Sequence, residues 1–522
     1  MADRPQPLKL AGWTGIAVAA AIPAIIAATS FAVVLAAEGR WSLGAADVAA
    51  LRFTIWQAFL SGLISVLLAI PLARALARRR FTGRSLLITL LGAPFLLPVI
   101  VAVFGLLAIF GRAGLLNTGL TYFGYPPISI FGLHGVVLAH VFLNLPLATR
   151  LLLQGWQSIP AERFRLAASL DLGPSAIFRH LEVPMLARAL PPAFLVIFVI
   201  CTTSFAVALT LGGGPRATTV ELAIYQAIRF EFDMTRAAVL SSVQLVITGV
   251  AAVIALKWAA TTGFGAGLDR VSERWDSQSF VARGLDATLI VFGTLFLLAP
   301  MTAVVLRGAP FVAGLPESVW VSVTQSLLVA AISTGLVALG SVAVALAAAR
   351  IGQKARYVEA AGLMAIAASP MVVGTGLFII LFAFVDPSDV ALPVTALVNA
   401  MVTLPFALRV LIPAVRDAEA TFGRLADSLS LTGWARMRLV VLPRVRRPLG
   451  FSAGLAAALS MGDLGVVALF ADPDTATLPL QIYRLMGAYR MDDAAGASLL
   501  LLTISFLLFW MCDWGGRRGA TD

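Results

Sequence analysis

The sequence predicts an all-α polytopic membrane protein with about 12 transmembrane helices, arranged as two tandem, duplicated six-helix halves. Composition is the first reason: 60% of the 522 residues are hydrophobic and 12% are charged, whereas about 25% are charged in a typical soluble domain. The second reason is a series of apolar runs of spanning length. The third is a polar pattern that occurs twice, 259 residues apart.

The apolar runs have the length of transmembrane helices, because about 20 residues of α-helix cross the hydrocarbon core of a bilayer. None shows the alternation of a membrane β-barrel strand, so helices are expected throughout. The first run follows Arg4 and Lys9 as a secretory signal would, but it is long enough to span, and no clear cleavage site follows, so we expect it to be retained. The runs cover residues 12–37, 53–73, 86–110, 132–153, 190–211, 237–257, 285–306, 320–348, 358–385, 390–413, 448–471 and 494–513.

Basic residues set the orientation of the predicted helices. The formal net charge of +11 would suit a nucleic-acid-binding protein, but Lys and Arg lie in short blocks between apolar runs, such as Arg78-Arg79-Arg80. With the N-terminus inside, about 29 of the 38 basic residues fall on the cytoplasmic side, as the positive-inside rule requires. The sequence therefore predicts cytoplasmic termini, contact between the basic blocks and membrane lipid, and no nucleic-acid partner.

Two polar segments between apolar runs identify an internal duplication. Residues 165–184 read RLAASLDLGPSAIFRHLEVP and residues 424–443 read RLADSLSLTGWARMRLVVLP, and the offset is 259 at both ends. LPLATR at 145–150 and LPFALR at 404–409 keep the same offset. An even number of helices per half makes the repeats parallel. The predicted domains are a first half at 1–260 with a loop at 155–189, a cytoplasmic linker at 261–284, and a second half at 285–522 with a loop at 414–447.

The repeated loops are too long for simple hairpins and too rich in aliphatic residues for disorder. Leu and Ala at three- and four-residue spacing predict helices over 161–170 and 421–429, each followed by a turn and a short second helix. A helix–turn–helix presented twice is a docking surface for a symmetric partner, and the alternative is that the loops only cap the bundle. The turn and the return to the membrane are marked by Gly173 and Pro184 in the first copy and by Gly433 and Pro443 in the second.

The sequence offers no catalytic or metal-binding constellation. It lacks a GxxxxGK[ST] phosphate-binding loop, and His134, His140 and His180 have no metal-ligand spacing with carboxylates or cysteines. Cys201 and Cys512 lie in apolar runs and do not correspond under the repeat, so a disulfide has no support. We therefore expect no enzyme activity, no metal and no cofactor in this chain.

The two loops resemble the EAA motif of ABC importer permeases, which has the form E-A-A-x3-G-x9-I-x-L-P. Aligning the closing prolines puts Arg165 and Arg424 at the motif's glutamate, and Asp171 and Ser430 at its glycine. Both copies depart from the motif at these two positions but keep its length and closing aliphatic residues. The resemblance implies a type I ABC importer permease fold in which each loop is a coupling helix moved by an ATPase. The implied coupling residues are Arg165, Leu166, Ala167, Asp171, Gly173 and Pro184, and Arg424, Leu425, Ala426, Ser430, Gly433 and Pro443.

Longer segments resemble, within that family, the fused permeases of bacterial thiamine importers. They lie at residues 56–84, 96–105, 139–154, 204–228 and 461–483. The resemblance implies import of thiamine, and of its phosphates, across the inner membrane by alternating access. It also implies two copies of a separate ABC ATPase subunit, which binds ATP and Mg, a periplasmic substrate-binding protein, and one copy of this chain supplying both permease halves.

Other substrates and one other class of transporter stay open at this point. Importers of iron(III), polyamine or sulfate use similar scaffolds, and only the longer segments favour thiamine. Secondary transporters of the major facilitator class also have two six-helix halves. However, the loop ARALARRRFTGRS at 73–85 contains none of the acidic residues common in that class. That class also has no use for two long, similar loops.

Asp463 is the most informative polar residue within an apolar run. It lies about two-thirds of the way across the eleventh run, where an aspartate costs roughly 2.5 to 3.5 kcal/mol and should face a cavity or the bundle interior. Its first-half counterpart is Ser204. A single carboxylate would suit the cationic thiazolium of thiamine, and an interhelical hydrogen bond is the alternative. The outer segments 212–226 and 472–483 are expected to receive the binding protein, through Arg216, Glu221, Tyr225 and Tyr483.

Overall fold

The computed structural model of the chain describes residues 10–38, 41–92, 96–258, 278–472 and 475–517. Within these residues the chain is almost entirely helical and contains no β-strand. The all-α prediction is therefore confirmed. Most of the linker predicted at 261–284 lies outside the described residues, as do Arg4 and Lys9.

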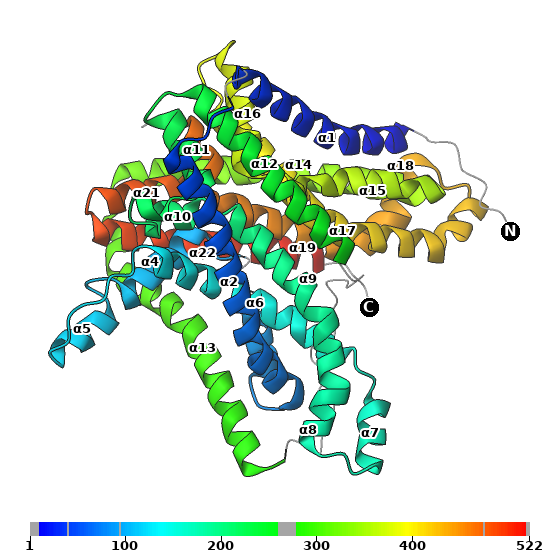
Figure 1. Cartoon of the computed structure of the whole chain (residues 1–522). Coiled ribbons are helices and arrows are strands. Elements are labelled where there is room, and N and C mark those ends of the chain that lie inside the picture. The colour runs from blue at the N-terminus through cyan, green and yellow to red at the C-terminus, as the bar shows by residue number, and fades with distance from the viewer. Residues whose placement is uncertain (1–9, 39–40, 93–95, 259–277, 473–474, 518–522) are drawn as a thin grey trace. The chain divides into compact units, whose positions relative to one another are not determined.

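Eleven helical stretches of the described chain are long and apolar enough to cross a bilayer (Figure 1). They are formed by α1 (Leu10–Ala36), α2 (Ala45–Arg78), α4 (Val99–Phe110) with α5 (Leu115–Tyr122), α6 (Leu133–Gln157), α8 (Pro174–Ile177) with α9 (Val183–Thr202), α12 (Met234–Trp258), α13 (Phe280–Gly308), α14 (Glu317–Arg350), α17 (Ala391–Ser428), α18 (Gly433–Arg436) with α19 (Leu442–Met461) and α20 (Gly465–Phe470), and α22 (Met491–Arg517). The remaining α-helices are α3 (Arg84–Leu90), α7 (Ala161–Ser169), α10 (Ala206–Leu211), α11 (Val220–Arg229), α15 (Ala355–Leu363), α16 (Pro370–Phe382) and α21 (Leu478–Gly487).

The run at 358–385 is not the single spanning helix that its hydrophobicity predicts. The structure divides it into α15, a short 3₁₀ turn and the 13-residue α16, which begins at Pro370. Proline has no N–H to donate and disfavours helical backbone in the residue before it, so it starts a helix more easily than it continues one. In the first half, α4 likewise begins directly after Pro98. The described residues therefore contain 11 candidate spans, in line with the prediction of about 12, and Pro370–Phe382 is a shorter apolar helix.

Packing divides the chain into two compact units, which we describe separately. One unit combines Met1–Gly44, Val220–Gly249 and Pro310–Asp522, and the other combines Ala45–Thr219 and Val250–Ala309. The predicted halves are units of sequence duplication, whereas these are units of packing, and the two sets of boundaries differ. The boundaries at 260 and 285 therefore remain a prediction about the duplication.

In the first unit, α1 packs against helices from the second half of the sequence. It contacts α14, α15 and α16, and it lies beside α16 in Figure 1. Small residues allow this close approach: a Cβ atom at Gly376 would lie 2.6 Å from the carbonyl oxygen of Thr29, and one at Gly15 would overlap the backbone of Ala343. Close packing at small residues is how membrane helices associate, because lipid provides little hydrophobic drive between them.

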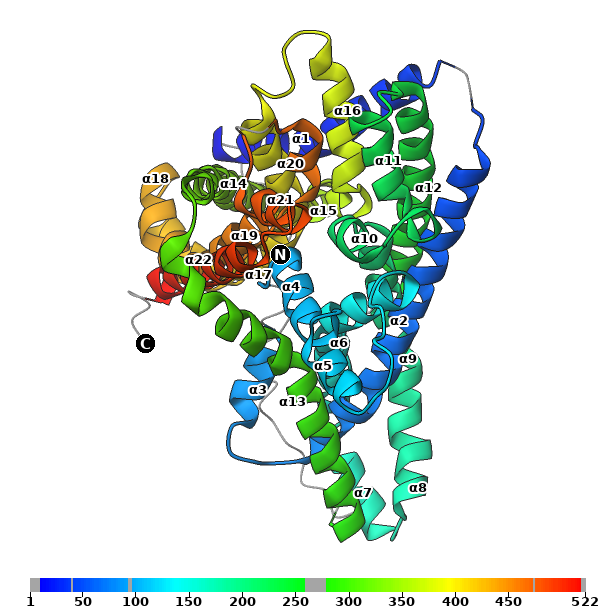
Figure 2. The same cartoon turned by 90° about the vertical axis from the view of Figure 1, so that its left-hand side faces the viewer.

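The second unit contains the reciprocal arrangement, since α13 packs against α2 and α4 from the first half of the sequence. Figure 2 shows α13 passing beside α4. At this contact Gly105 of α4 faces the backbone of Pro300 in α13, and a Cβ atom at Gly105 would lie 2.6 Å from the Pro300 oxygen. Glycine is therefore required for α4 and α13 to approach this closely.

Replacing Gly105 by alanine should separate α4 from α13. We expect a loss of about 1–3 kcal/mol, typical of an overpacked contact, even though alanine is the better helix former. The measurement is thermal unfolding of the purified protein in detergent. Gly119→Ala is the matched control, because no other atom lies within 4 Å of a Cβ built at Gly119 of α5. Equal stability of the two variants would contradict the packing argument.

Candidate functional site

The structure confirms the helix–turn–helix predicted for both repeated loops. The first loop consists of α7, a turn, α8 and the π-helical segment Phe178–Glu182, which continues into α9. The second consists of the end of α17, a turn, α18 and the π-helical segment Met437–Val441, which continues into α19. The two π-helical segments keep the 259-residue offset. π-Helical turns are rare and are frequent at functional sites, so their repetition favours a shared role.

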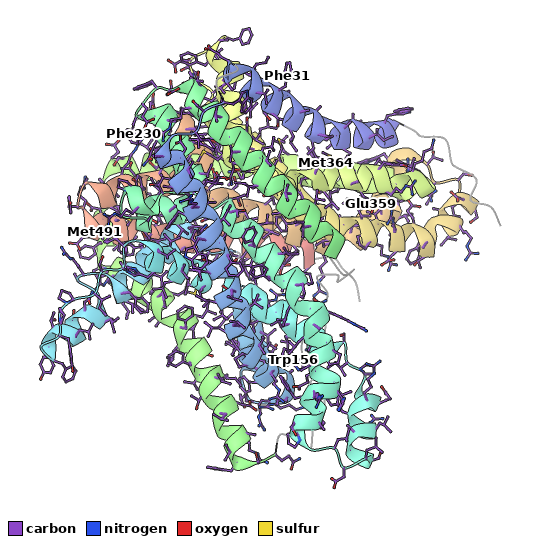
Figure 3. All side chains as sticks on the ribbon, in the orientation of Figure 1. Phe31, Trp156, Phe230, Glu359, Met364 and Met491 are labelled. Carbon is purple, nitrogen blue, oxygen red and sulfur yellow. The ribbon has the colours of Figure 1, made fainter. Side chains whose placement is uncertain are left out.

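The loops differ in how they leave the preceding span. A break at Ser158–Pro160 separates α7 from α6, whereas α17 runs for 38 residues through the equivalent position. Pro160 explains the break, because the residue before a proline avoids helical backbone; the second copy has Glu419 there. Trp156, labelled in Figure 3, is 2% exposed and anchors the end of α6 just before the first loop.

Asp171 and Ser430 both adopt left-handed backbone, with φ of 48° and 53°. Each follows the end of a helix, and the next residue closes the turn: Leu172 N donates to Ala167 O at 3.0 Å, and Leu431 N donates to Ala426 O at 2.8 Å. This is the helix ending in which glycine is preferred, because glycine alone enters this region without strain. The motif's glycine is thus explained by geometry, and this chain keeps the geometry with other residues.

Both loops expose apolar side chains at their surface, where these side chains do not stabilise the isolated chain. Leu166 and Leu170 are each 62% exposed, and Leu425 and Leu429 are 57% and 61% exposed. Each pair is separated by four residues and so lies on one face of its helix. Of the predicted coupling residues, only Ala167 and Ala426 are buried. The rest, including Arg165 and Arg424, are exposed.

The first loop is attached to α2 by an ion pair that sequence reasoning missed. Arg74 Nε donates to Glu182 Oε2 at 2.7 Å, and the Glu182 side chain is fully buried. The Arg74 guanidinium also lies 5.1 Å from the centre of the Phe178 ring. Separating the two residues would leave a buried charge without its partner, which costs free energy. We therefore expect the first loop and α2 to move together.

The second loop is held by a different set of charges. Arg436 is bonded to Glu419 and to Asp427, with Nη1 2.5 Å from Asp427 Oδ1. Arg444 lies 4.1 Å from the centre of the Phe422 ring. In the alignment of the repeats, Arg436 corresponds to the buried Ile177. The sequence signal for both sets of interactions was a charged residue in one repeat that aligns with an aliphatic residue in the other.

Asp463 and Ser204 lie at helix breaks, which the prediction of continuous spans did not include. α19 ends at Met461 and α20 begins at Gly465, so Asp463 lies in the interruption. Its Oδ1 accepts from Gly465 N at 3.3 Å, and its Oδ2 is buried with no hydrogen-bond partner among the described residues. Ser204 lies in the equivalent break between α9 and α10. Interrupted helices with exposed backbone groups line substrate paths in many transporters.

The four residues expected to contact a binding protein have different environments. Arg216 is exposed on a short 3₁₀ turn, whereas Tyr225 is buried and Tyr483 is half-buried. Glu221 of α11 is completely enclosed, accepting from Ser369 Oγ at 2.5 Å and Gln244 Nε2 at 3.0 Å. Burial raises the pKa of Glu221 to about 8, although the two hydrogen bonds act to lower this pKa. A carboxyl so enclosed cannot touch a partner in this conformation, and we do not include it in the proposed docking surface.

These features define an integral membrane permease built by duplication, with an exposed helix–turn–helix loop in each half. The chain is 39% identical over 542 residues to the thiamine transport system permease protein ThiP of Salmonella typhimurium, with 100% of both chains covered. It is 38% identical over 544 residues to ThiP of Escherichia coli K12, again with full coverage. It therefore belongs to the family of thiamine transport system permease proteins, and the predicted family resemblance is confirmed.

Two further comparisons bear on the alternatives. ThiP of Brucella abortus strain 2308 is 40% identical over 469 residues, covering 88% of this chain and 86% of that protein. A probable sulfate transport system permease of Helicosporidium is 27% identical over 219 residues, covering 41% of this chain. No family model matches the chain. Full-length similarity to thiamine permeases disfavours the iron(III), polyamine, sulfate and secondary-transporter alternatives.

The left-handed residues in the turns allow a direct test. Asp171→Gly and Ser430→Gly should each stabilise the protein by about 0.5–1 kcal/mol, because glycine relieves the left-handed strain at some cost in unfolded-state entropy. Thermal unfolding in detergent measures the change. Ala168→Gly is the control, since it puts glycine inside α7 and should destabilise by about 1 kcal/mol. Loss of stability in both turn variants would contradict the assigned backbone geometry.

Proposed function

We propose that this chain is the transmembrane subunit of an ATP-driven importer that carries thiamine, and its phosphates, across the bacterial inner membrane. Full-length similarity to thiamine permeases is the observation that carries the proposal. A separate ATPase subunit, present in two copies, binds ATP and Mg and does the hydrolysis. This chain contributes no catalytic residue and no cofactor, and one copy supplies both permease halves.

The exposed faces of α7 and of the last turns of α17 form the proposed ATPase-docking surfaces. Each presents two leucines four residues apart and one arginine, Arg165 or Arg424. Burying two leucines stabilises a complex by a few kcal/mol, and the arginine favours an acidic rim on the partner. Two surfaces with the same backbone are what two identical ATPase subunits need.

Motion of the first ATPase can reach the membrane through a short path. The buried Arg74–Glu182 pair fixes the first loop to α2, and the π-helical segment continues without a break into α9. In the second loop, the Arg436 interactions make the loop one body with α17. ATP-driven closure of the ATPases then moves whole helices, and the importer alternates between inward-open and outward-open states.

The helix breaks at Asp463 and Ser204 are the proposed contacts along the substrate path. Oδ2 of Asp463 is buried without a hydrogen-bond partner among the described residues, and we propose that it pairs with a cation such as the thiazolium ring when the substrate path opens. On the periplasmic side, Arg216 and the surfaces around Tyr225 and Tyr483 are proposed to receive the substrate-binding protein. In the proposed orientation both termini lie in the cytoplasm, in agreement with the distribution of basic residues.

The substrate assignment is tested with the assembled complex in lipid. The chain is purified with its ATPase and binding protein, and ATP hydrolysis is measured with thiamine, thiamine phosphates, iron(III), spermidine and sulfate. Stimulation by thiamine compounds alone is expected. A complex that hydrolyses ATP but is indifferent to thiamine would remove the substrate assignment and leave the permease class standing.

Reversing the charge on both loops should weaken ATPase docking. The double variant Arg165→Glu and Arg424→Glu puts a carboxylate into each surface, and we expect at least a tenfold loss of affinity for the ATPase, or about 1.4 kcal/mol or more. Co-purification at increasing salt measures it. Arg112→Glu with Arg216→Glu is the control, because it makes the same charge change at exposed sites outside the loops. Normal assembly of the loop variant would place these arginines outside the interface.

Removing the charge of Asp463 should impair transport without disturbing assembly. Asp463→Asn keeps the size of the side chain and an oxygen for Gly465 N, so the helix break should persist. We expect thiamine uptake to fall at least tenfold, or about 1.4 kcal/mol or more. Uptake into proteoliposomes is the measurement, and Asp386→Asn at an exposed site is the control. Unchanged uptake would leave Asp463 with only its local capping role.

A further inference from the structure

Beside the first loop the structure contains a cleft of about 2240 Å³, which shares Arg165 with the proposed ATPase-docking surface and is otherwise not used by the proposed function. Its walls come from the end of α2, from α3, from α7 and from α13, all within one compact unit. Typical small-molecule pockets measure about 300–1,000 Å³. The cleft therefore has room for a large or elongated molecule.

Part of the cleft lining is strongly basic. The lining includes one acidic residue, Glu162, against six arginines. The neighbouring carboxylate of Asp286 accepts from Arg78 Nε at 2.7 Å and from Arg79 Nε at 2.6 Å, so that two carboxylates, Glu162 and Asp286, accompany the six arginines. Nη2 of Arg79 is buried and has no hydrogen-bond partner within the described residues. The lining arginines are Arg78, Arg79, Arg80, Arg84, Arg165 and Arg283.

Another part of the lining is a largely apolar wall formed by one face of α13. Its lining residues run from Ala287 to Leu298 at three- and four-residue spacing, which keeps them on one side of the helix. Val291 and Leu295 are 56% and 58% exposed. At 1.5 Å per residue the wall is about 16 Å long, close to half of the roughly 30 Å hydrocarbon core of a bilayer.

We propose that this cleft binds an anionic phospholipid from the membrane leaflet in which the arginine cluster lies. Guanidinium groups bind phosphate through paired hydrogen bonds, and the apolar face of α13 supports an acyl chain. A lipid with net negative charge matches the excess of arginines over carboxylates in the lining, which a zwitterionic lipid does not, and a soluble phosphate leaves the apolar wall uncovered. The proposal rests on the membrane location of the chain, not on its substrate.

Native mass spectrometry of the full chain, released from nanodiscs that contain phosphatidylglycerol and phosphatidylcholine, tests the proposal. The wild type should retain at least one phosphatidylglycerol in preference to phosphatidylcholine. Arg80→Gln with Arg283→Gln removes two cleft arginines and keeps Arg78 and Arg79, which bond to Asp286, and retention should fall at least tenfold. Arg350→Gln with Lys354→Gln removes two basic charges outside the cleft and should leave retention unchanged.

Two further measurements separate the lipid from other anions. Val291→Ser with Leu295→Ser keeps every arginine and should also weaken lipid retention, because it removes the acyl-chain wall. Inorganic phosphate at millimolar concentration should not displace the lipid. Equal loss in the cleft and control arginine variants, displacement by phosphate, or no preference for phosphatidylglycerol would each overturn the proposal.

Discussion

Inside a bilayer no water is present to form hydrogen bonds with an unpaired backbone N–H or C=O group. This constraint determines where a helix of the chain can be interrupted. At the start of α16, the Ser369 hydroxyl accepts from Met371 N and Val372 N at 3.2 and 3.4 Å. At the start of α20, Asp463 accepts from Gly465 N. Polar side chains at breaks thus replace the hydrogen bonds that the helix loses. Asp463 has one oxygen left over after doing so, and this distinguishes it from a capping residue alone.

The duplication has preserved backbone geometry more strictly than side-chain chemistry. Both loops have a π-helical segment and a left-handed residue at equivalent positions. The charges that hold them differ, since Glu182 pairs with α2 in the first copy and Arg436 pairs within the second loop. The proposed ATPase contact accounts for this pattern, because a partner would contact the shape and surface of a loop and not the interactions beneath it.

Much of the fold could be predicted because run length, charge blocks and repetition are properties of the linear sequence. The spans, the two loops and their turns follow from these properties. Hydropathy does not register helix breaks, since the residues around Asp463 stay apolar on average while the backbone changes direction. The Arg74–Glu182 pair joins residues 108 positions apart, and the enclosure of Glu221 depends on helices packed around it. Such contacts need the tertiary arrangement.

Fusion of the two halves has a physical consequence of its own. A symmetric dimer carries every residue twice, so a costly buried carboxylate would appear in both copies. This chain has Asp463 in one half and Ser204 in the other, and it has the Arg436 interactions in one loop only. A fused chain can therefore add a single charge to a transport path at half the desolvation cost. In the substrate path that we propose, Asp463 supplies one counter-charge, which is what the single positive charge of the thiazolium ring needs.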